Sequence, residues 1–534
     1  MGSIAMNRSV ININKFIKKC LFASAALVVF ANAVSAETLR FRLGEDPESL
    51  YNVETTSLTA NQVIGQYMVE RLVYFDQNGE VQPWLAVTWE INDAQTEITF
   101  NLRDGIAFHD GEPFNAEAVA FHFKTVMDPA SASPNLARMG PLVSIDALDN
   151  LTVKFTFSEP YAPFFVTLAD VAGGINSPTA VMAAGDQYGR HPVGTGPYVF
   201  GSWIRGSEIR MTRNENYHPQ FRTDAANQSA PIAEEIILSV IAEDGVAQAA
   251  LEVGELTAAE LQADAIGLFV DNPDFNTVMD KTATNLVFLE FNHMRAPFDD
   301  PQMRKAIGHA VDRNAAVAAA WSGYASIALS PLSLGIPGFD GDIAEKYGTP
   351  YDPTKAAAIL DELGWVDSDG DGIRDKDGKP AKFLIKSYAG FTHIQRTLQV
   401  IQANLADIGV TAELETADWG AFYPSLLEDD WDMDLMRWTS SDAGILTDLY
   451  RSPGHRQKIA PNPAIDDLLT RCDNTVDPAK RLGCVAEAQK ALLETAIAVP
   501  ILTNWLVIAT QSNVQDYTID YLGYLIPGDV RIAE

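Results

Sequence analysis

The sequence predicts an α/β fold from three observations. Segments with strand character alternate with segments of helical period, most clearly over residues 383–438. The chain has 534 residues, of which 47% are hydrophobic and 9% are aromatic, so several large cores can form. No internal repeat or low-complexity linker divides the chain. We therefore expect several lobes that share a continuous hinge, and a mostly parallel sheet with right-handed crossovers over residues 383–438.

In the first half, apolar–polar alternation marks the strands. The expected strands are residues 37–43, 96–103 and 151–157. Apolar residues at helical spacing predict a helix within residues 61–75. Another helix is expected to follow the N-cap Asn115 and to run to Met127, because Asp128-Pro129 ends it.

In the second half, proline and glycine mark helix ends. Asp300-Pro301 and Asp352-Pro353 each place a capping acid before a first-turn proline, and Gly364 is a C-terminal cap. The other expected elements are strands at 383–387, 410–416 and 432–438 and helices at 393–408 and 422–427.

The first 36 residues predict a signal peptide. Basic residues precede the apolar run Cys20–Ala31, and Val34-Ser35-Ala36 suits signal peptidase. We expect cleavage after Ala36 and a periplasmic mature protein. A retained membrane anchor is the alternative, but the apolar run is shorter than a stable span.

Charge and motifs limit the function classes. The chain has 38 Lys+Arg against 71 Asp+Glu, a formal net charge of −33, which disfavours binding to nucleic acid. It has no G-x-S-x-G, H-E-x-x-H or P-loop motif. We expect a protein that is not an enzyme and needs no cofactor.

Two cysteines remain after the expected cleavage. Cys472 lies on a predicted helix over residues 463–473, and Cys484 lies on a second helix that starts at Asp477-Pro478. Two antiparallel helices with a short turn would bring the sulfurs together in an oxidising compartment. We expect a disulfide, with two buried thiols as the alternative.

One segment resembles half of a calcium loop. Asp367, Asp369, Asp371 and Asp375 stand at ligand positions, but Gly378 occupies the place of the bidentate glutamate. A structural calcium ion is one interpretation. An Asp/Gly-rich hairpin turn is the other, and we prefer it because the same residues form side-chain–backbone hydrogen bonds.

Several blocks of sequence carry a family resemblance. They are Pro83-Trp84-Leu85-Ala86 with Thr99–Ala116, then Gly194–Tyr217 (GTGPYVFGSWIRGSEIRMTRNENY), Asn292–Arg313 and Tyr351–Trp365. In this order they resemble the large extracytoplasmic solute-binding proteins of ABC importers, family 5, which includes dipeptide-, oligopeptide- and nickel-binding proteins.

The resemblance implies a two-lobed fold of the periplasmic-binding-protein type that closes on a solute by a hinge. The implied parts are a lobe-one core at 37–60, 191–280 and 504–534, an inserted subdomain at 61–190, and lobe two at 281–503. It also implies a monomer that delivers its ligand to a membrane permease with a separate ATPase.

The resemblance also suggests ligand-binding residues. In peptide-binding relatives an aspartate after the tryptophan of the 432–438 strand receives the ligand's amino group, so Asp442 is a candidate, with Ser441 at the expected spacing. Arg437 can pair a carboxylate or form a structural salt bridge, and Trp438 can stack on the ligand or fill the hinge core. The weaker candidates are Tyr388, Trp419, Glu54 and Thr55.

We expect the solute to be a short peptide or an amino-acid or sugar conjugate such as an opine. A metal-chelate binding protein of the nickel type is one alternative. A secreted acidic hydrolase is another.

Overall fold

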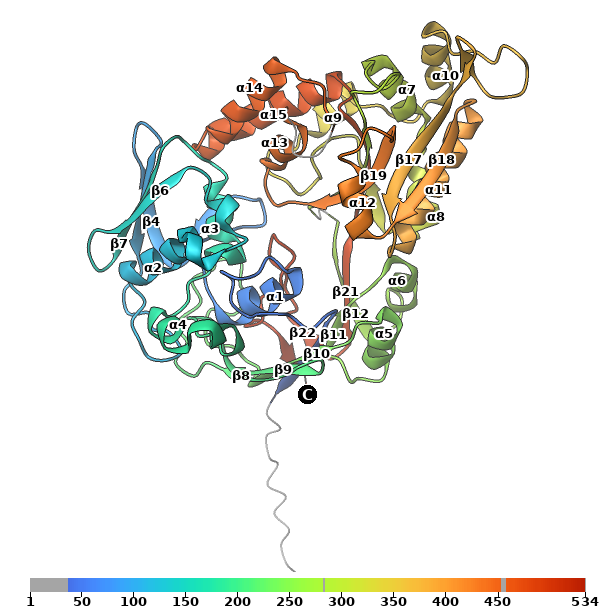
Figure 1. Ribbon diagram of the computed structural model, residues 1–534. Coiled ribbons are helices and arrows are strands. Elements are labelled where there is room, and N and C mark those ends of the chain that lie inside the picture. The colour runs from blue at the N-terminus through green and yellow to red at the C-terminus, as the bar shows by residue number, and fades with distance from the viewer. Residues whose placement is uncertain (1–36, 282–283, 453–457, 534) are drawn as a thin grey trace, which may run out of the picture. The chain divides into compact units, whose positions relative to one another are not determined.

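Three sheets organise the computed structural model, which describes residues 37–281, 284–452 and 458–533 (Figure 1). Residues 37–534 form one compact unit. The predicted signal peptide and its cleavage site lie outside the described residues. Among the described residues, no helix has the length and hydrophobicity needed to cross a bilayer.

The first sheet has seven strands. In spatial order they are β12 (Phe275–Asp280), β21 (Leu506–Gln511), β11 (Ala258–Glu260), β1 (Thr38–Leu43), β10 (Glu235–Val240), β9 (Glu208–Arg213) and β8 (Tyr198–Ile204). β1 is parallel to β10 and β11, and the other pairs are antiparallel. Its strands thus come from three distant parts of the sequence.

The second sheet has four antiparallel strands. They are β4 (Ala86–Ile91), β5 (Glu97–Leu102), β7 (Thr152–Phe157) and β6 (Leu142–Ala147). Helices α2 (Ala116–Met127) and α3 (Phe164–Ala169) contribute to the core of this sheet, where Phe123 and Phe164 both contact Phe155. The alternation of Glu97–Leu102 and Thr152–Phe157 reflects this one-sided burial.

The third sheet has six strands and is mixed. In spatial order they are β14 (Ala325–Ile327), β20 (Ala498–Asn504), β13 (Asn285–Phe291), β19 (Met433–Thr439), β17 (Lys382–Tyr388) and β18 (Thr411–Ala417). β17 is parallel to β18 and β19, as the 383–438 run predicts, but the other pairs are antiparallel. The expectation of a mostly parallel sheet is therefore wrong for the whole sheet, because strands from outside the run complete it.

The remaining elements cover the sheets or form hairpins. The helices are α1 (Leu58–Val63), α4 (Pro178–Ala184), α5 (Asp244–Glu252), α6 (Ala263–Phe269), α7 (Pro301–Ala310), α8 (Arg313–Trp321), α9 (Gly341–Tyr347), α10 (Pro353–Glu362), α11 (Thr392–Asp407), α12 (Trp419–Ser425), α13 (Ile445–Tyr450), α14 (Pro463–Asp473) and α15 (Pro478–Glu494). The short strand pairs are β2 (Val73–Phe75) with β3 (Val81–Pro83), β15 (Asp375–Lys376) with β16 (Lys379–Pro380), and β22 (Val514–Gln515) with β23 (Arg531–Ile532).

Two local predictions need correction. The helix expected within residues 61–75 ends at Met68 after a π-helical turn (Ile64–Met68), and Val73–Phe75 form a strand. The apolar spacing there reflects burial on several sides rather than one helix face, since Leu72 and Val73 are both fully buried. The helix expected at 422–427 lies at Trp419–Ser425, because the Asp418 side chain caps it at Ala421.

Two chain crossings join the first and third sheets. β12 ends at Asp280 and β13 begins at Asn285, while only Trp505 separates β20 from β21. The Asn285 side chain donates to the Asn504 carbonyl at 2.9 Å and accepts from the Asn504 backbone N–H at 3.0 Å. Asn285 and Asn504, at the third-sheet ends of the two crossings, therefore lie side by side.

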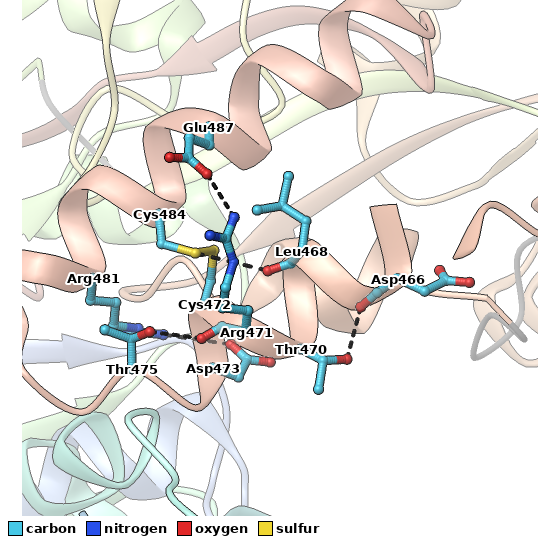
Figure 2. The surroundings of a disulfide bond; sticks show 10 residues. All are labelled: Asp466, Leu468, Thr470, Arg471, Cys472, Asp473, Thr475, Arg481, Cys484 and Glu487. Atoms are coloured by element: carbon cyan, nitrogen blue, oxygen red, sulfur yellow. Dashed lines mark hydrogen bonds and ion pairs between the residues drawn. A yellow bond between two sulfur atoms is a disulfide. The ribbon is translucent and has the colours of Figure 1, made fainter. Parts of the chain in front are cut away.

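Helices α14 and α15 form a hairpin joined by a disulfide between Cys472 and Cys484 (Figure 2). The sulfurs are 2.04 Å apart, and Arg471 pairs with Glu487 across the hairpin at 2.6 Å. Asp477 caps α15 by accepting from the Lys480 N–H. The buried face of α14 includes Ile465, Leu469 and Cys472.

The acidic segment before β15 folds as a hairpin turn. The Asp367 carboxylate accepts hydrogen bonds from the backbone N–H groups of Gly370 and Gly372. Asp375 accepts from Ser368. Oxygens of Asp367, Asp369 and Asp371 lie within 4.8 Å of one another on the exposed surface. The calcium interpretation stays a prediction.

Candidate functional site

A cavity of about 1070 Å³ lies where the three sheets approach one another. Four groups of residues line it: the end of β1, β11 and the segment Tyr517–Leu525; Arg138 and the segment Glu159–Asp170; the segment Trp438–Asp448 with the end of α14; and residues of the segment Thr59–Tyr67. The first group follows the carboxyl ends of strands β1 and β11, and the third follows β19. Such strand ends are the usual place for ligands in α/β sheets.

On the third-sheet wall, the chain turns sharply after β19. The Ser440 hydroxyl accepts from the Asp442 N–H at 3.2 Å, and the Asp442 carboxylate accepts from the Gly444 N–H at 2.7 Å. These bonds form side-chain turns that direct Asp442 into the cavity lining.

An arginine already neutralises Asp442. Arg481, on α15, contacts both Asp442 oxygens at 2.5 and 2.7 Å. Burial opposes ionisation of Asp442, but the Arg481 guanidinium outweighs it and holds the pKa of this carboxyl below its usual value. Asp473 is a weaker partner, with 3.7 Å between its carboxylate and Arg481. Burial raises the pKa of Asp473 to about 6, and the attraction of Arg481 offsets this effect only in part.

On the wall next to the four-stranded sheet, Arg138 pairs with Asp170 at 2.5 Å. Asp170 also accepts from the Val171 N–H at 2.6 Å. The Thr167 hydroxyl donates to the Arg138 carbonyl at 3.0 Å. These contacts fix one cation and one anion at the edge of the cavity.

On the seven-stranded wall, Arg42 and Glu260 face the cavity. The Arg42 guanidinium pairs with Asp244 at 2.7 Å and donates to the carbonyls of Ile241 and Ala242, both at 2.8 Å. Among the described residues, none forms a hydrogen bond or ion pair with the Glu260 side chain. Its side chain is accessible from the cavity, but the surrounding protein removes part of its hydration and raises its pKa.

The structure places only some of the predicted ligand-binding residues in the lining of the cavity. Of the eight candidates, Trp438, Ser441 and Asp442 line the cavity. The Arg437 guanidinium lies 5.9 Å from the centre of the Phe391 ring.

The other four candidates lie away from the cavity lining. Tyr388 is buried and contacts the ring of the exposed Trp419 edge-on at 5.3 Å. Glu54 accepts from Ser49, and the Thr55 hydroxyl accepts from the Ser57 N–H. Ligand contact by any of the eight stays a prediction.

Sequence reasoning missed Arg481, Arg138 and Glu260. Arg481 lies 39 residues from Asp442 in the sequence, on a helix whose pattern indicates only its own caps and apolar face. Glu260 follows two alanines in a three-residue strand too short to show alternation. No local signal distinguished these residues from the many other charged ones.

The chain matches a known protein family. The family model of bacterial extracellular solute-binding proteins, family 5, matches residues 80–457. The chain belongs to this family. It is thus a solute-binding protein of ABC importers, with the α/β fold that the sequence predicts.

Similar proteins cover almost the whole of this family 5 solute-binding protein. The nickel-binding periplasmic protein of Escherichia coli (strain K12) is 27% identical over 503 residues, 90% of this chain and 91% of that protein. The glutathione-binding protein GsiB of Shigella dysenteriae is 26% identical, over 86% of this chain and 88% of that protein. The structure of NikA from Brucella suis in complex with Fe(III)-EDTA is similar in fold, with a TM-score of 0.81, 23% identity and coverage of 93% and 99%.

Proposed function

We propose that this protein captures a small polar organic solute, a short peptide or an amino-acid or sugar conjugate such as an opine, and delivers it to a membrane permease. The signal peptide would be cleaved after Ala36, and the mature protein would act in the periplasm as a monomer without catalysing a reaction. The permease would be driven by a separate ATPase subunit.

The size of the cavity is the main observation that supports this proposal. A volume of about 1070 Å³ lies just above the range for sites that hold organic ligands, roughly 300–1,000 Å³. A solute that fills this space has many atoms. Glutathione, named for the Shigella relative, is a peptide of this kind.

The lining suits a solute that carries charges and hydrogen-bonding groups. It combines carboxylates, guanidinium groups and hydroxyls with aromatic rings, which include Tyr161, Trp438 and Tyr517. Closure of the lobes on such a solute would strengthen each polar contact by excluding water, and the solute stabilises the closed form only by the extra contacts it makes there.

A metal chelate is the second candidate. The E. coli relative is named for nickel, and the Brucella structure holds Fe(III) within EDTA, an organic chelator. A chelated metal also has the size of an organic solute, so the cavity volume suits both candidates.

A thermal-shift screen tests the proposal. The mature protein is heated with tripeptides, opines and nickel chelates, and binding raises Tm by mass action. A Tm rise with peptides or opines supports the first candidate, and a rise only with chelates supports the second. No rise with any compound argues against both.

Turnover separates a binding protein from a hydrolase. Each compound that raises Tm is incubated with the protein and then analysed by mass spectrometry. An unchanged compound supports the proposal, whereas accumulation of hydrolysis product contradicts it.

A further inference from the structure

We propose that Glu260 holds the positively charged group of the captured solute. This assignment rests on the proposed function and narrows its solute to compounds with an ammonium or guanidinium group. It differs from the expectation that Asp442 receives the amino group.

The position of Glu260 is fixed by the sheet. β11 lies between β1 and β21, and the Glu260 Cα is paired with Ile508. The preceding alanines, Ala258 and Ala259, also line the cavity and leave space around the carboxylate. A strand within a sheet holds its side chain more rigidly than a loop.

The charged groups around Glu260 leave its carboxylate available for a cation of the solute. Arg42, a cation on the same wall of the cavity, is held by Asp244 and two backbone carbonyls. The Glu260 carboxylate has no hydrogen-bond or ion-pair partner within the described part of the chain. Burial raises the pKa of Glu260, and the attraction of Arg437 and Arg42 offsets this effect only in part. A cation that approaches the carboxylate from the cavity would therefore add stabilisation.

Asp442 is in the opposite situation. Its two oxygens contact Arg481 at 2.5 and 2.7 Å, so a ligand ammonium would have to displace a bidentate guanidinium. Displacing Arg481 from Asp442 would leave this buried guanidinium with only Asp473, at 3.7 Å, as a charged partner, which is costly. Asp442 therefore serves to position Arg481, and a different carboxylate meets the solute.

An aromatic ring completes the proposed cation site. Tyr517 and Glu260 both line this wall of the cavity, and burial, together with the charge of Glu260, raises the pKa of the Tyr517 hydroxyl. The Tyr517 ring also packs edge-on against Phe41, with 6.2 Å between ring centres. A carboxylate next to an aromatic ring binds a cation by charge and by cation–π attraction.

The test compares Glu260→Gln with wild type and with Glu255→Gln. Glu255 is exposed, lies five residues earlier and does not line the cavity, so its variant has the same change in net charge. Each protein is incubated with a defined mixture of tripeptides and opines, half of them with free amino groups and half N-acetylated. Bound compounds are identified by mass spectrometry after desalting, and Tm without ligand verifies folding.

We expect wild type and Glu255→Gln to retain compounds with free amino groups. Glu260→Gln should retain at least tenfold less of these compounds and have an unchanged ligand-free Tm.

Retention of N-acetylated compounds by wild type, or undiminished retention by Glu260→Gln, would overturn the role of Glu260 while the proposed function stands. If wild type retained nothing, both proposals would fail. If Glu260→Gln lost its fold, Glu260→Asp provides the measurement, because it keeps the charge and should retain the same compounds more weakly.

Discussion

At the residue scale, the contacts of Glu70 explain the roles of two residues in the Gly194–Tyr217 block. The carboxylate is fully buried, and it accepts from the Thr195 hydroxyl at 2.8 Å and the Tyr217 hydroxyl at 2.8 Å. His218 adds a third contact at 2.8 Å. The block that carries the family resemblance thus closes around one buried charge.

Replacing this charge should destabilise the protein. In Glu70→Gln an amide N–H₂ would face groups that themselves donate hydrogen bonds, and we expect a loss of about 2–4 kcal/mol in the free energy of unfolding. Urea denaturation measures it. Glu80→Gln, at an exposed site in a nearby turn, is the control and should change stability by less than about 0.5 kcal/mol. An equal loss in both variants would contradict this prediction.

The contact between Glu70 and His218 makes the stability of the protein depend on pH. Burial disfavours the charged form of His218, but Glu70 outweighs it and raises the pKa of His218 above 6.5. The folded state then binds this proton more tightly than the unfolded chain. The contribution is complete below pH 6.5 and is lost as pH rises through the raised pKa. We expect urea denaturation of His218→Gln to show a smaller decline in stability between pH 6 and 9 than wild type, and an identical decline would contradict the pairing.

At the element scale, the α14–α15 hairpin combines local signals with a covalent link. The disulfide joins residues 12 apart in sequence, and closing so short a loop should contribute about 2–3 kcal/mol. We expect Cys472→Ala/Cys484→Ala to lower the free energy of unfolding by this amount. Wild type treated with dithiothreitol should lose the same amount, and the double variant should not respond to the reductant.

Local signals were the most predictable part of the structure. Asn115 and Asp352 cap helices where the sequence predicts, because a cap depends on residues three positions away. Strands β13 and β20 were missed, since all seven residues of β13 are buried and show no alternation. Their pairing joins Val287 to Leu502, which no local pattern can indicate. Local patterns also could not indicate the partner of Asp442. The sequence suggested Asp442 as a ligand-binding residue but not its ion pair with Arg481.

At the scale of the whole molecule, contacts connect opposite walls of the cavity. The Ala162 N–H donates to the Asp473 carbonyl at 2.8 Å. The Gln95 side-chain oxygen accepts from the N–H groups of Val476 and Asp477 at 3.0 and 3.3 Å. The four-stranded sheet is thereby attached to the turn of the disulfide-linked hairpin.

Removing the Gln95 contact should favour separation of the two walls. Two hydrogen bonds of about 1 kcal/mol each would be lost in Gln95→Ala, so we expect a larger radius of gyration by small-angle scattering without ligand, and weaker solute binding by fivefold or more. Gln95→Glu keeps an acceptor oxygen next to the N-terminus of α15 and should restore the wild-type value. Identical scattering from all three proteins would contradict the prediction.

The paired crossings at Asp280–Asn285 and Asn504–Leu506 have a consequence for the cost of capture. The Asn285–Asn504 hydrogen bonds join the strands where both crossings meet the third sheet, and we expect this link to allow bending in one direction and to oppose twisting and sliding. We therefore expect the open protein to explore a narrow arc rather than a wide range of orientations. Little orientational entropy remains to be lost when the solute arrives, and more of the contact energy is left to hold it.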